Sequence, residues 1–161
     1  MKKIILVRHA KSSWKHNVID HERPLNERGL RDASMVSNHL KSKKLSVDKV
    51  LSSDAIRAKH TAEIFISNLE ISNNLFELNH NLYDFSGENL IASIKHVDSV
   101  INNLMVFGHN HAITEFVNTY GNKSIDNVPT CGVTIINFNI DNWADLNKGE
   151  TVYTLWPKEL K

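Results

Sequence analysis

The segment KIILVRHA, at residues 3–10, decides the expected fold. Its short, unbroken apolar run is typical of a strand in the centre of a parallel sheet that is covered on both faces. Arg8 and His9 follow this run at once. Because open α/β sheets bind ligands beyond the carboxyl ends of their strands, the segment predicts both the sheet and the place of a functional site.

Two later segments are built in the same way. Residues 47–53 predict a strand that leads into a helical segment containing Arg57, and residues 104–108 predict a strand that leads directly into His109. The carboxyl ends of parallel strands meet at one edge of a sheet. We therefore expect these side chains to join the arginine and histidine of the first segment in an anion site that includes a nucleophilic histidine.

The remaining apolar periodicity predicts helices between these strands and an antiparallel pair of strands near the end. Asn26 and Asp54 each precede a helical pattern and are expected to be its N-cap. Helices are expected at residues 26–44, 54–65, 86–101 and 113–121, further strands at 136–140 and 151–156, and a short strand or a turn at 75–78. This order predicts an α/β fold: a three-layer α/β/α sandwich with a mostly parallel central sheet and an antiparallel edge.

Length and composition restrict the class of protein. A chain of 161 residues predicts a single domain, residues 1–161. A net charge of +1, with 41% hydrophobic and 23% charged residues, argues against disorder and against a nucleic-acid partner. The apolar run of the first segment is too short for a signal peptide, and no stretch reaches membrane-spanning length. One cysteine, Cys131, excludes an internal disulfide, so we expect a cytoplasmic protein with no membrane partner.

The nine histidines raise the question of a metal site. They are scattered, however, and show neither the His-x-x-x-His nor the His-Glu-x-x-His spacing of helical zinc ligands. His109 and His111 are the only close pair. The sequence therefore predicts no metal and no cofactor.

Hydrolysis of a phosphoryl group suits the four strand-end residues. The transferring group carries negative charge on its equatorial oxygens, so catalysis depends mainly on positioning and on fixed positive charge. Arg8 and Arg57 have planar guanidinium groups that can each bind two oxygens, and His109, if protonated, would add a third donor. With this much fixed charge a divalent metal is unnecessary for the reaction.

His9 is the expected nucleophile. A neutral imidazole leaves one ring nitrogen free to attack phosphorus while the other nitrogen is held by a backbone carbonyl. The neighbouring cations should lower the pKa of His9, and a bound phosphate should raise the pKa of His109. The reaction would pass through a phosphohistidine on His9 that water then hydrolyses.

Four segments, taken in chain order, resemble the motifs of the histidine phosphatase superfamily, and within it the small phosphohistidine phosphatase branch. They are RHAKSS at 8–13, RPLNERG at 23–29, SSDAIRA at 52–58 and GHN at 108–110. The resemblance implies a phosphoglycerate-mutase-like fold with His9 as the phosphorylated residue. It also implies a phosphate pocket formed by Arg8, Arg57 and His109, with Arg23 as a further substrate contact.

The chain departs from the family pattern where a general acid is expected. Many members of the family carry a carboxylate directly after the second histidine, where this chain has Asn110, or before the third helix, where Asp84 and Glu88 are the candidates. An alkoxide leaving group needs such an acid, whereas the imidazole of a phosphohistidine leaves readily once its ring is protonated. A site rich in cations and poor in acids should therefore prefer phosphohistidine or other activated phosphates.

Three functions are compatible with these observations. The favoured one is a metal-independent phosphatase that acts on protein phosphohistidine, because a short chain has little room for insertions that would enclose a small substrate. The alternative enzyme is a phosphomonoesterase for a small phosphorylated metabolite, with Asp84 or Glu88 as the acid. The third is a degenerate module that only binds phosphorylated partners, although the four site residues are all retained.

Overall fold

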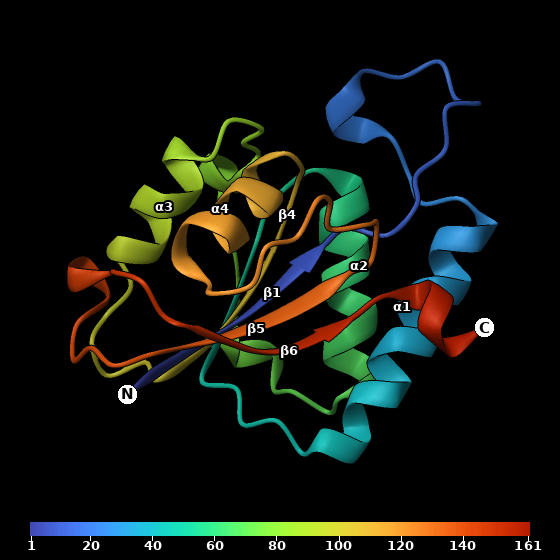
Figure 1. The fold of residues 1–161 in the computed structure, drawn as a ribbon. Helices are drawn as coiled ribbons and strands as arrows, with labels where there is room; N and C mark the ends of the chain where they lie inside the picture. The colour runs from blue at the N-terminus through green and yellow to red at the C-terminus, as the bar shows by residue number, and fades with distance from the viewer.

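The computed structural model describes all residues, 1–161, and contains one six-stranded sheet between two layers of helices (Figure 1). The strands are β1 (Lys2–Arg8), β2 (Lys49–Ser52), β3 (Phe76–Leu78), β4 (Asn103–Gly108), β5 (Val133–Phe138) and β6 (Glu150–Leu155). The α-helices are α1 (Glu27–Leu40), α2 (Ile56–Asn68), α3 (Glu88–Lys95) and α4 (Ala112–Tyr120). Short 3-10 helices are η1 (Asp20–Glu22), η2 (Lys41–Lys43), η3 (Asn73–Leu75), η4 (His80–Leu82), η5 (Trp143–Asp145) and η6 (Pro157–Leu160).

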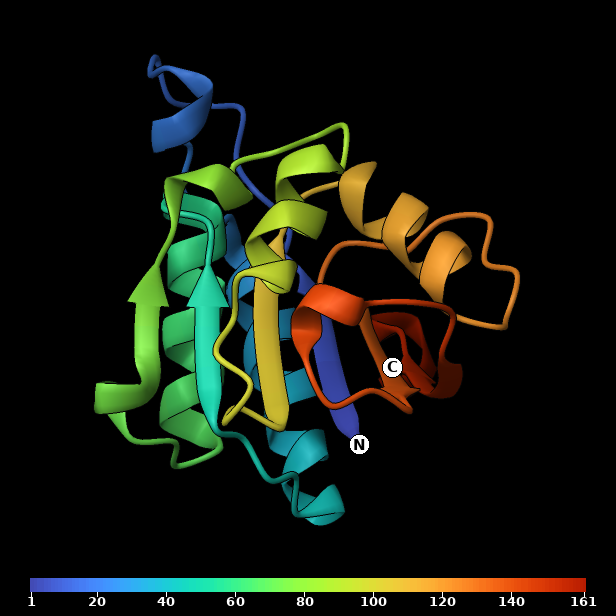
Figure 2. The same cartoon turned by 90° about the vertical axis from the view of Figure 1, so that its left-hand side faces the viewer.

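The sheet has the strand order β3-β2-β4-β1-β5-β6. The first four strands in this order run parallel, and β5 and β6 are antiparallel to their neighbours. Figure 2 shows the parallel strands side by side, with the loop that follows β1 projecting beyond their carboxyl ends. The predicted three-layer fold, with its antiparallel edge, is confirmed.

Alternate residues of β1 supply two separate core layers. Ile4 and Leu6 lie in the layer that contains Phe116 of α4, and Ile5 and Val7 lie in the layer that contains Phe65 of α2. Because side chains of a strand point to opposite faces in turn, an unbroken apolar run is what a strand covered on both sides requires. The helices α3 and α4 cover one face and α1 and α2 the other (Figure 1).

The start of α1 explains why the RPLNERG motif contains an asparagine and a glycine. Asn26 is the N-cap, as predicted, and its side-chain oxygen accepts a hydrogen bond from the backbone N–H of Gly29 at 2.8 Å. A Cβ atom on Gly29 would lie 2.1 Å from the carbonyl oxygen of Lys11. The glycine therefore allows the first turn of α1 to pack against the backbone that follows His9.

Several predicted boundaries are wrong: α1 ends at Leu40, α2 continues to Asn68, and β5 covers Val133–Phe138 rather than 136–140. Asp54 does not cap α2, whose N-cap is Ala55, because the Asp54 carboxylate is hydrogen-bonded to two histidines instead. The helix expected at 86–101 ends at Lys95. Beyond it the Asp98 side chain accepts a hydrogen bond from the backbone N–H of Val100 at 2.9 Å, a local contact that competes with helix continuation.

None of the helices has the length and apolar character that crossing a membrane requires.

Candidate active site

The register of the parallel strands brings the predicted site residues together. Arg8, the last residue of β1, pairs with Gly108, the last residue of β4. His9 and His109 therefore follow the two strands side by side, and their ring centroids are 5.2 Å apart. Arg57 arrives from the first turn of α2, directly after the neighbouring strand β2.

The His9 ring is buried and oriented by its own backbone. Its Nδ1 atom donates a hydrogen bond to the carbonyl oxygen of Ala10 at 2.7 Å, which leaves Nε2 as the atom with a free lone pair. Burial lowers the pKa of His9 to about 3; the Ala10 hydrogen bond opposes this shift, and the charges of Arg57, Arg8 and Arg23 add to it. The ring is therefore neutral near pH 7, as a nitrogen nucleophile requires.

Two buried arginine nitrogens have no partner in the protein. Arg8 donates from Nη1 to the carbonyl oxygen of Val128 at 2.9 Å, and Arg57 donates from Nη1 to the carbonyl oxygen of Asp20 at 2.7 Å. The Nε atom of each arginine is buried without a hydrogen-bond acceptor. Because buried donors are normally satisfied, unpaired ones on two neighbouring cations indicate a place for an anion.

His109 contributes a neutral ring. Burial lowers its pKa to about 2, with further lowering by His9 and Arg57. His109 is therefore neutral in the protein without a bound anion, and its protonation with phosphate bound stays a prediction. Its Nε2 atom lies 2.8 Å from Ser53 Oγ, which also accepts the backbone N–H of Ala55. The Ser53 hydroxyl proton has no other acceptor in the structure, so we assign it to Nε2 and the ring proton to Nδ1.

This assignment makes the His109 Nδ1–H group a third buried donor. Nδ1 has no hydrogen-bond partner in the protein, like the two arginine Nε atoms. A neutral imidazole can thus supply the hydrogen bond that was expected from a charged one.

Asp20 is the carboxylate of the site that the sequence did not reveal. Its side chain accepts hydrogen bonds from Arg57 Nη2 and Arg23 Nη1, both at 2.9 Å, and from the Tyr83 hydroxyl at 2.6 Å. Burial alone would raise the pKa of Asp20, but the hydrogen bonds from Tyr83, Arg57 and Arg23 lower it well below its usual range. Asp20 is therefore ionised, and it accepts a hydrogen bond from an N–H group at the edge of the Arg57 guanidinium.

Only the place of Asp20 in the long polar loop could have drawn attention to it. The loop directly follows His9 and Ala10, but the sequence contains nothing that pairs Asp20 with an arginine 37 residues away. Tyr83 was missed for the same reason, since it lies in a segment without clear periodicity.

Arg23 organises this loop. It donates from Nε to the carbonyl oxygen of Ser13 at 3.1 Å and from Nη2 to the Ser12 hydroxyl, and its guanidinium carbon lies 3.3 Å from the centroid of the Trp14 ring. With the Asp20 contact, all three of its side-chain nitrogens have partners within the protein. Its direct contact with substrate stays a prediction.

The three positions where a general acid was expected hold a helix-capping residue, an exposed glutamate and an asparagine. Asp84 accepts hydrogen bonds from the backbone N–H groups of Gly87 and Leu90, both at 3.0 Å, and thereby caps the start of α3. Burial raises the pKa of Asp84, but these hydrogen bonds and those from Ser86 outweigh burial and lower the pKa. Glu88 is exposed and makes no side-chain hydrogen bond or ion pair. Asn110, the third position considered, uses its oxygen to accept from Thr114.

Two further residues hold the end of β1 in place. The Thr61 hydroxyl accepts from the backbone N–H of Ala10 at 3.0 Å and donates to the carbonyl oxygen of Arg57 at 2.7 Å. The backbone N–H of Cys131 lies 3.0 Å from the carbonyl oxygens of both Arg8 and His9. Cys131 has a φ of 60°, a conformation that costs free energy in a residue with a side chain, so its backbone is held there by these contacts.

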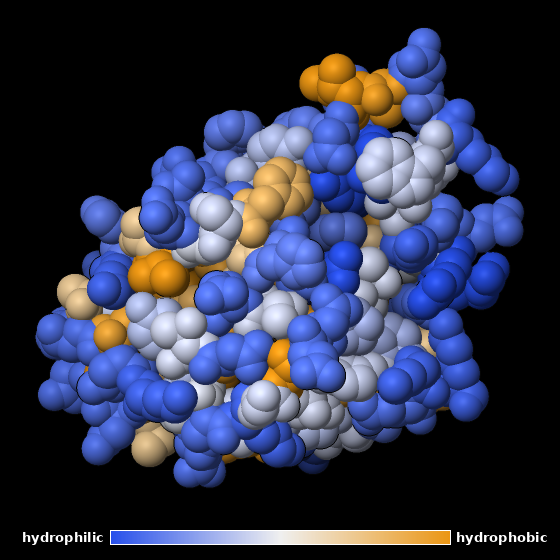
Figure 3. Space-filling model, turned by 45° about the horizontal axis from the view of Figure 1, so that its top comes forward, coloured by the Kyte–Doolittle hydropathy of each residue, from blue (hydrophilic) through white to orange (hydrophobic).

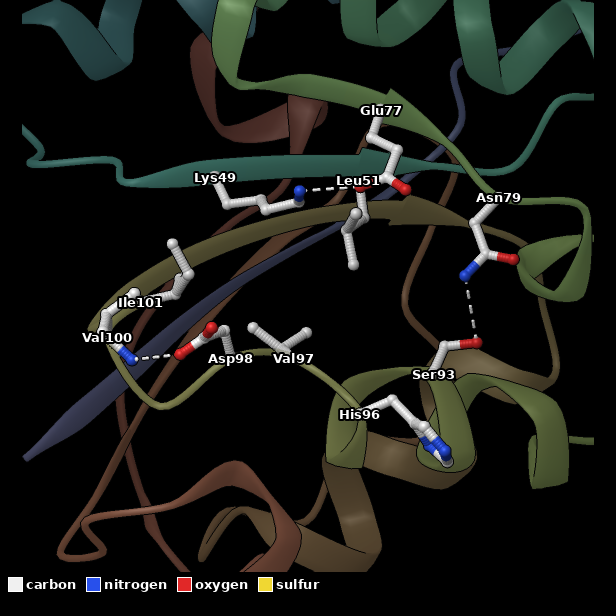
Figure 4. A pocket seen from close by; sticks show the side chains of 10 residues that line it. All are labelled: Lys49, Leu51, Glu77, Asn79, Ser93, His96, Val97, Asp98, Val100 and Ile101. Atoms are coloured by element: carbon white, nitrogen blue, oxygen red, sulfur yellow. Dashed lines mark hydrogen bonds and ion pairs between the residues drawn. The ribbon is translucent and has the colours of Figure 1, made fainter.

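The surroundings of the site are open. The loop after β1 projects from the molecule and carries apolar side chains (Figure 3), and Trp14, Ile19 and Phe85 are exposed. A surface hollow of about 400 Å³ lies elsewhere, between α3 and the strands β2 and β3 (Figure 4). Its lining includes Lys49, Glu77 and His96 but none of the site residues, so we do not connect it with the reaction.

Comparison with known proteins identifies the family. The sequence model of the histidine phosphatase superfamily (branch 1) matches residues 4–88, which is more than half of the chain. The chain belongs to this superfamily, and it is a phosphatase of the hydrolase class. The family and the enzyme class expected from the motifs are thus confirmed.

Related sequences span most of the chain. An uncharacterized protein of Mycobacterium tuberculosis strain H37Rv is 28% identical over 153 residues, which cover 89% of this chain and 93% of that protein. An uncharacterized chloroplastic protein of Arabidopsis thaliana is 27% identical over 155 residues, which cover 89% of this chain and 70% of the relative.

Solved structures share the fold. The protein histidine phosphatase SixA, complexed with tungstate, superposes with a TM-score of 0.84 at 19% identity and covers 99% of both chains. The putative phosphohistidine phosphatase SixA of Agrobacterium tumefaciens has a TM-score of 0.81 at 21% identity, covering 97% of this chain and 98% of its own. Phosphoglycerate mutase of Bacillus anthracis has a TM-score of 0.63 at 19% identity, covering 84% of this chain and 87% of its own.

Proposed function

We propose that this protein hydrolyses phosphohistidine on other proteins and that the phosphoryl group passes through a covalent intermediate on His9. The observation that carries the proposal is the group of three buried donors without partners, Arg8 Nε, Arg57 Nε and His109 Nδ1, around a neutral histidine. These donors come from three separate strand ends. A phosphoryl group has the charge and the oxygen acceptors that would satisfy them.

The first step transfers the phosphoryl group to the enzyme. The Nε2 lone pair of His9 attacks phosphorus, and the P–N bond to the substrate imidazole breaks as that imidazole takes up a proton from solvent. Arg8 and Arg57 stabilise the charge on the equatorial oxygens. The hydrogen bond between His9 Nδ1 and Ala10 keeps the attacking nitrogen aimed at the phosphoryl group.

The second step restores the enzyme. Water attacks phosphorus, the P–N bond to His9 breaks, and inorganic phosphate leaves with the proton balance completed by solvent. A phosphoryl group that binds Arg57 through Nε and Nη2 would share the Nη2 nitrogen with Asp20, and the two anions would repel each other. We therefore expect the Asp20 carboxylate to compete with phosphate for Arg57.

The shortage of acids supports phosphohistidine over a phosphoester as substrate. Asp84 caps a helix, and Asp20 is ionised because its hydrogen bonds lower its pKa. General acid catalysis is worth roughly 10²- to 10⁴-fold in rate where the leaving group needs a proton. An imidazole leaving group needs this help less, so it is the better substrate for such a site.

The open surroundings support a macromolecular substrate. The exposed side chains of Trp14 and Ile19 lie on the loop beside the pocket, where another protein could contact them. Two structural relatives are described as a protein histidine phosphatase and as a putative phosphohistidine phosphatase, which agrees with this choice.

The test compares turnover of a phosphohistidine-carrying protein with turnover of p-nitrophenyl phosphate, with His9→Ala as the inactive control. We expect kcat/KM at least tenfold higher on the phosphohistidine protein and no turnover by the variant. A preference for the phosphoester would support a phosphomonoesterase for a small metabolite instead. Tight binding of both compounds without turnover would support a phosphate-binding module.

A further inference from the structure

His21, Asp54 and His80 meet beside the proposed active site, and the proposed reaction uses none of them. His21 lies in η1, Asp54 in the turn between β2 and α2, and His80 in η4. His21 Nε2 is 2.8 Å from Asp54 Oδ1, and His80 Nδ1 is 3.0 Å from both carboxylate oxygens. One potential ligand atom from each side chain lies within 4.8 Å of the other two.

We infer that these three side chains bind a divalent transition-metal ion such as Zn²⁺. Zinc binds imidazole nitrogen and carboxylate oxygen at about 2.0–2.2 Å, and the ligand atoms of a tetrahedral site are then about 3.3 Å apart. The His–Asp separations of 2.8 Å and 3.0 Å would widen slightly on binding, and the two histidine nitrogens, which lie within 4.8 Å of each other, would take up the same spacing. Three protein ligands leave the fourth position open for water or an anion.

The donor set selects the kind of ion. Two imidazole nitrogens with one carboxylate favour Zn²⁺ and its first-row neighbours, whereas Mg²⁺ and Ca²⁺ prefer oxygen ligands. The His80 side chain is 72% exposed and His21 and Asp54 are 28% and 30% exposed, so an ion can reach the trio from solvent.

The position of the trio gives the ion a role in holding the site together. The Tyr83 ring packs edge-on against His21, with centroids 4.9 Å apart, and against His109 at 5.4 Å. Asp20, next to His21 in the chain, is bound to Arg57. An ion on His21 would therefore fasten η1, and the loop that contains it, to the body of the protein beside the pocket.

The sequence could not reveal this site by ligand spacing. Asp54 is 33 residues from His21 and 26 residues from His80, so no short motif contains two of the ligands. The expectation that the chain has no metal site rested on motifs within one helix. The inference leaves the proposed reaction metal-independent, because the four strand-end residues supply its charge.

Isothermal titration of the full chain with ZnCl₂ near pH 7, without phosphate or chelator, tests the inference. We expect one equivalent of Zn²⁺ to bind the wild type, and His80→Ala and Asp54→Asn each to weaken binding by at least tenfold, following the loss of a ligand. His96→Ala removes an exposed histidine at the end of α3 and should bind like the wild type. His80 is exposed, so its variant should fold normally.

A second readout is the visible absorption of bound Co²⁺, which is strong in tetrahedral sites. We expect this signal in the wild type and its loss in His80→Ala. Zinc affinity that is the same in the wild type and in the double variant His21→Ala/His80→Ala would overturn the inference. So would a wild type that binds no zinc, because the trio would then be a hydrogen-bonded network only. No substrate is present, so failure here leaves the proposed phosphatase activity untouched.

Discussion

The Asp20 carboxylate is bound to the Arg57 guanidinium, with Oδ2 of the former 2.9 Å from Nη2 of the latter. Asp20 also accepts from Tyr83 and Arg23, so three donors hold it in place. A carboxylate is similar in charge and acceptor geometry to part of a phosphoryl group. The protein thus carries an internal competitor for one of the two arginines that we propose bind phosphate.

Removal of this competitor should strengthen phosphate binding. We expect Asp20→Asn to raise the affinity for inorganic phosphate about tenfold, equivalent to about 1.4 kcal/mol, because the amide competes less well for Arg57. Titration calorimetry of both proteins measures the change. Glu22→Gln removes the same charge from an exposed position of η1 and should have little effect. Equal or weaker phosphate binding by Asp20→Asn would show that Asp20 does not compete.

Loss of the Arg57 guanidinium should slow the reaction. By analogy with removal of one oxyanion donor, Arg57→Ala should lower kcat/KM on the order of 10²- to 10³-fold. Arg57→Lys should recover part of the loss, since lysine keeps the charge but not the planar pair of donors. Arg31→Ala, at an exposed position of α1, is the control and should keep the wild-type rate. A near-normal rate for Arg57→Ala, in a variant with an unchanged circular dichroism spectrum, would contradict the proposed pocket.

The low pKa of His9 should make folding stability sensitive to acid. The folded protein keeps His9 neutral down to a pKa of about 3, whereas the unfolded chain protonates it below about pH 6.5. Unfolding therefore takes up a proton in this window, and its free energy falls as the pH falls below 6.5. Above pH 6.5 His9 is neutral in the folded and the unfolded protein, so it adds no pH dependence to the free energy of unfolding.

Urea unfolding at pH 7 and pH 5 measures this contribution. His9 should account for about 2 kcal/mol of the decrease between the two values, so the decrease should be smaller by that amount in His9→Asn. His16→Asn, at an exposed position of the loop, should retain the wild-type decrease. The same pH dependence in His9→Asn and in the wild type would mean that the ring is not held neutral.

Asp84 should matter for stability and not for leaving-group chemistry. Asp84→Asn weakens the hydrogen bonds that start α3 and should lower the free energy of unfolding by about 1 kcal/mol. Turnover of phosphohistidine and of an alkyl phosphate, whose alkoxide leaving group needs a proton, should stay in the same ratio. Selective loss of the phosphoester activity would instead identify Asp84 as a general acid.

Local patterns were sufficient to predict most of the fold and the centre of the site. The apolar run before Arg8 follows from burial of β1 on both faces, and the register of β1 against β4 then places His9 beside His109. The same patterns could not reveal contacts between distant segments. The Asp20–Arg57 pair lies in this second group, because it depends on how one irregular loop folds back over the sheet.

Corrections to helix ends have a related cause. Asp54 is a good N-cap residue by type, but His21 and His80 bind it from other segments, so tertiary contacts override the local preference. The low pKa of His109 without a bound anion likewise depends on burial beside His9 and Arg57, which is a property of the folded protein.

The most direct test of the account is detection of the phosphoryl group on the enzyme. The protein is mixed with a phosphohistidine-carrying substrate, quenched in alkali to preserve phosphoramidates, and analysed by peptide mass spectrometry. We predict an acid-labile phosphoryl group on His9 in the wild type, with neither label nor turnover in His9→Ala. Turnover by His9→Ala, or a label on another residue of the wild type, would contradict the central claim.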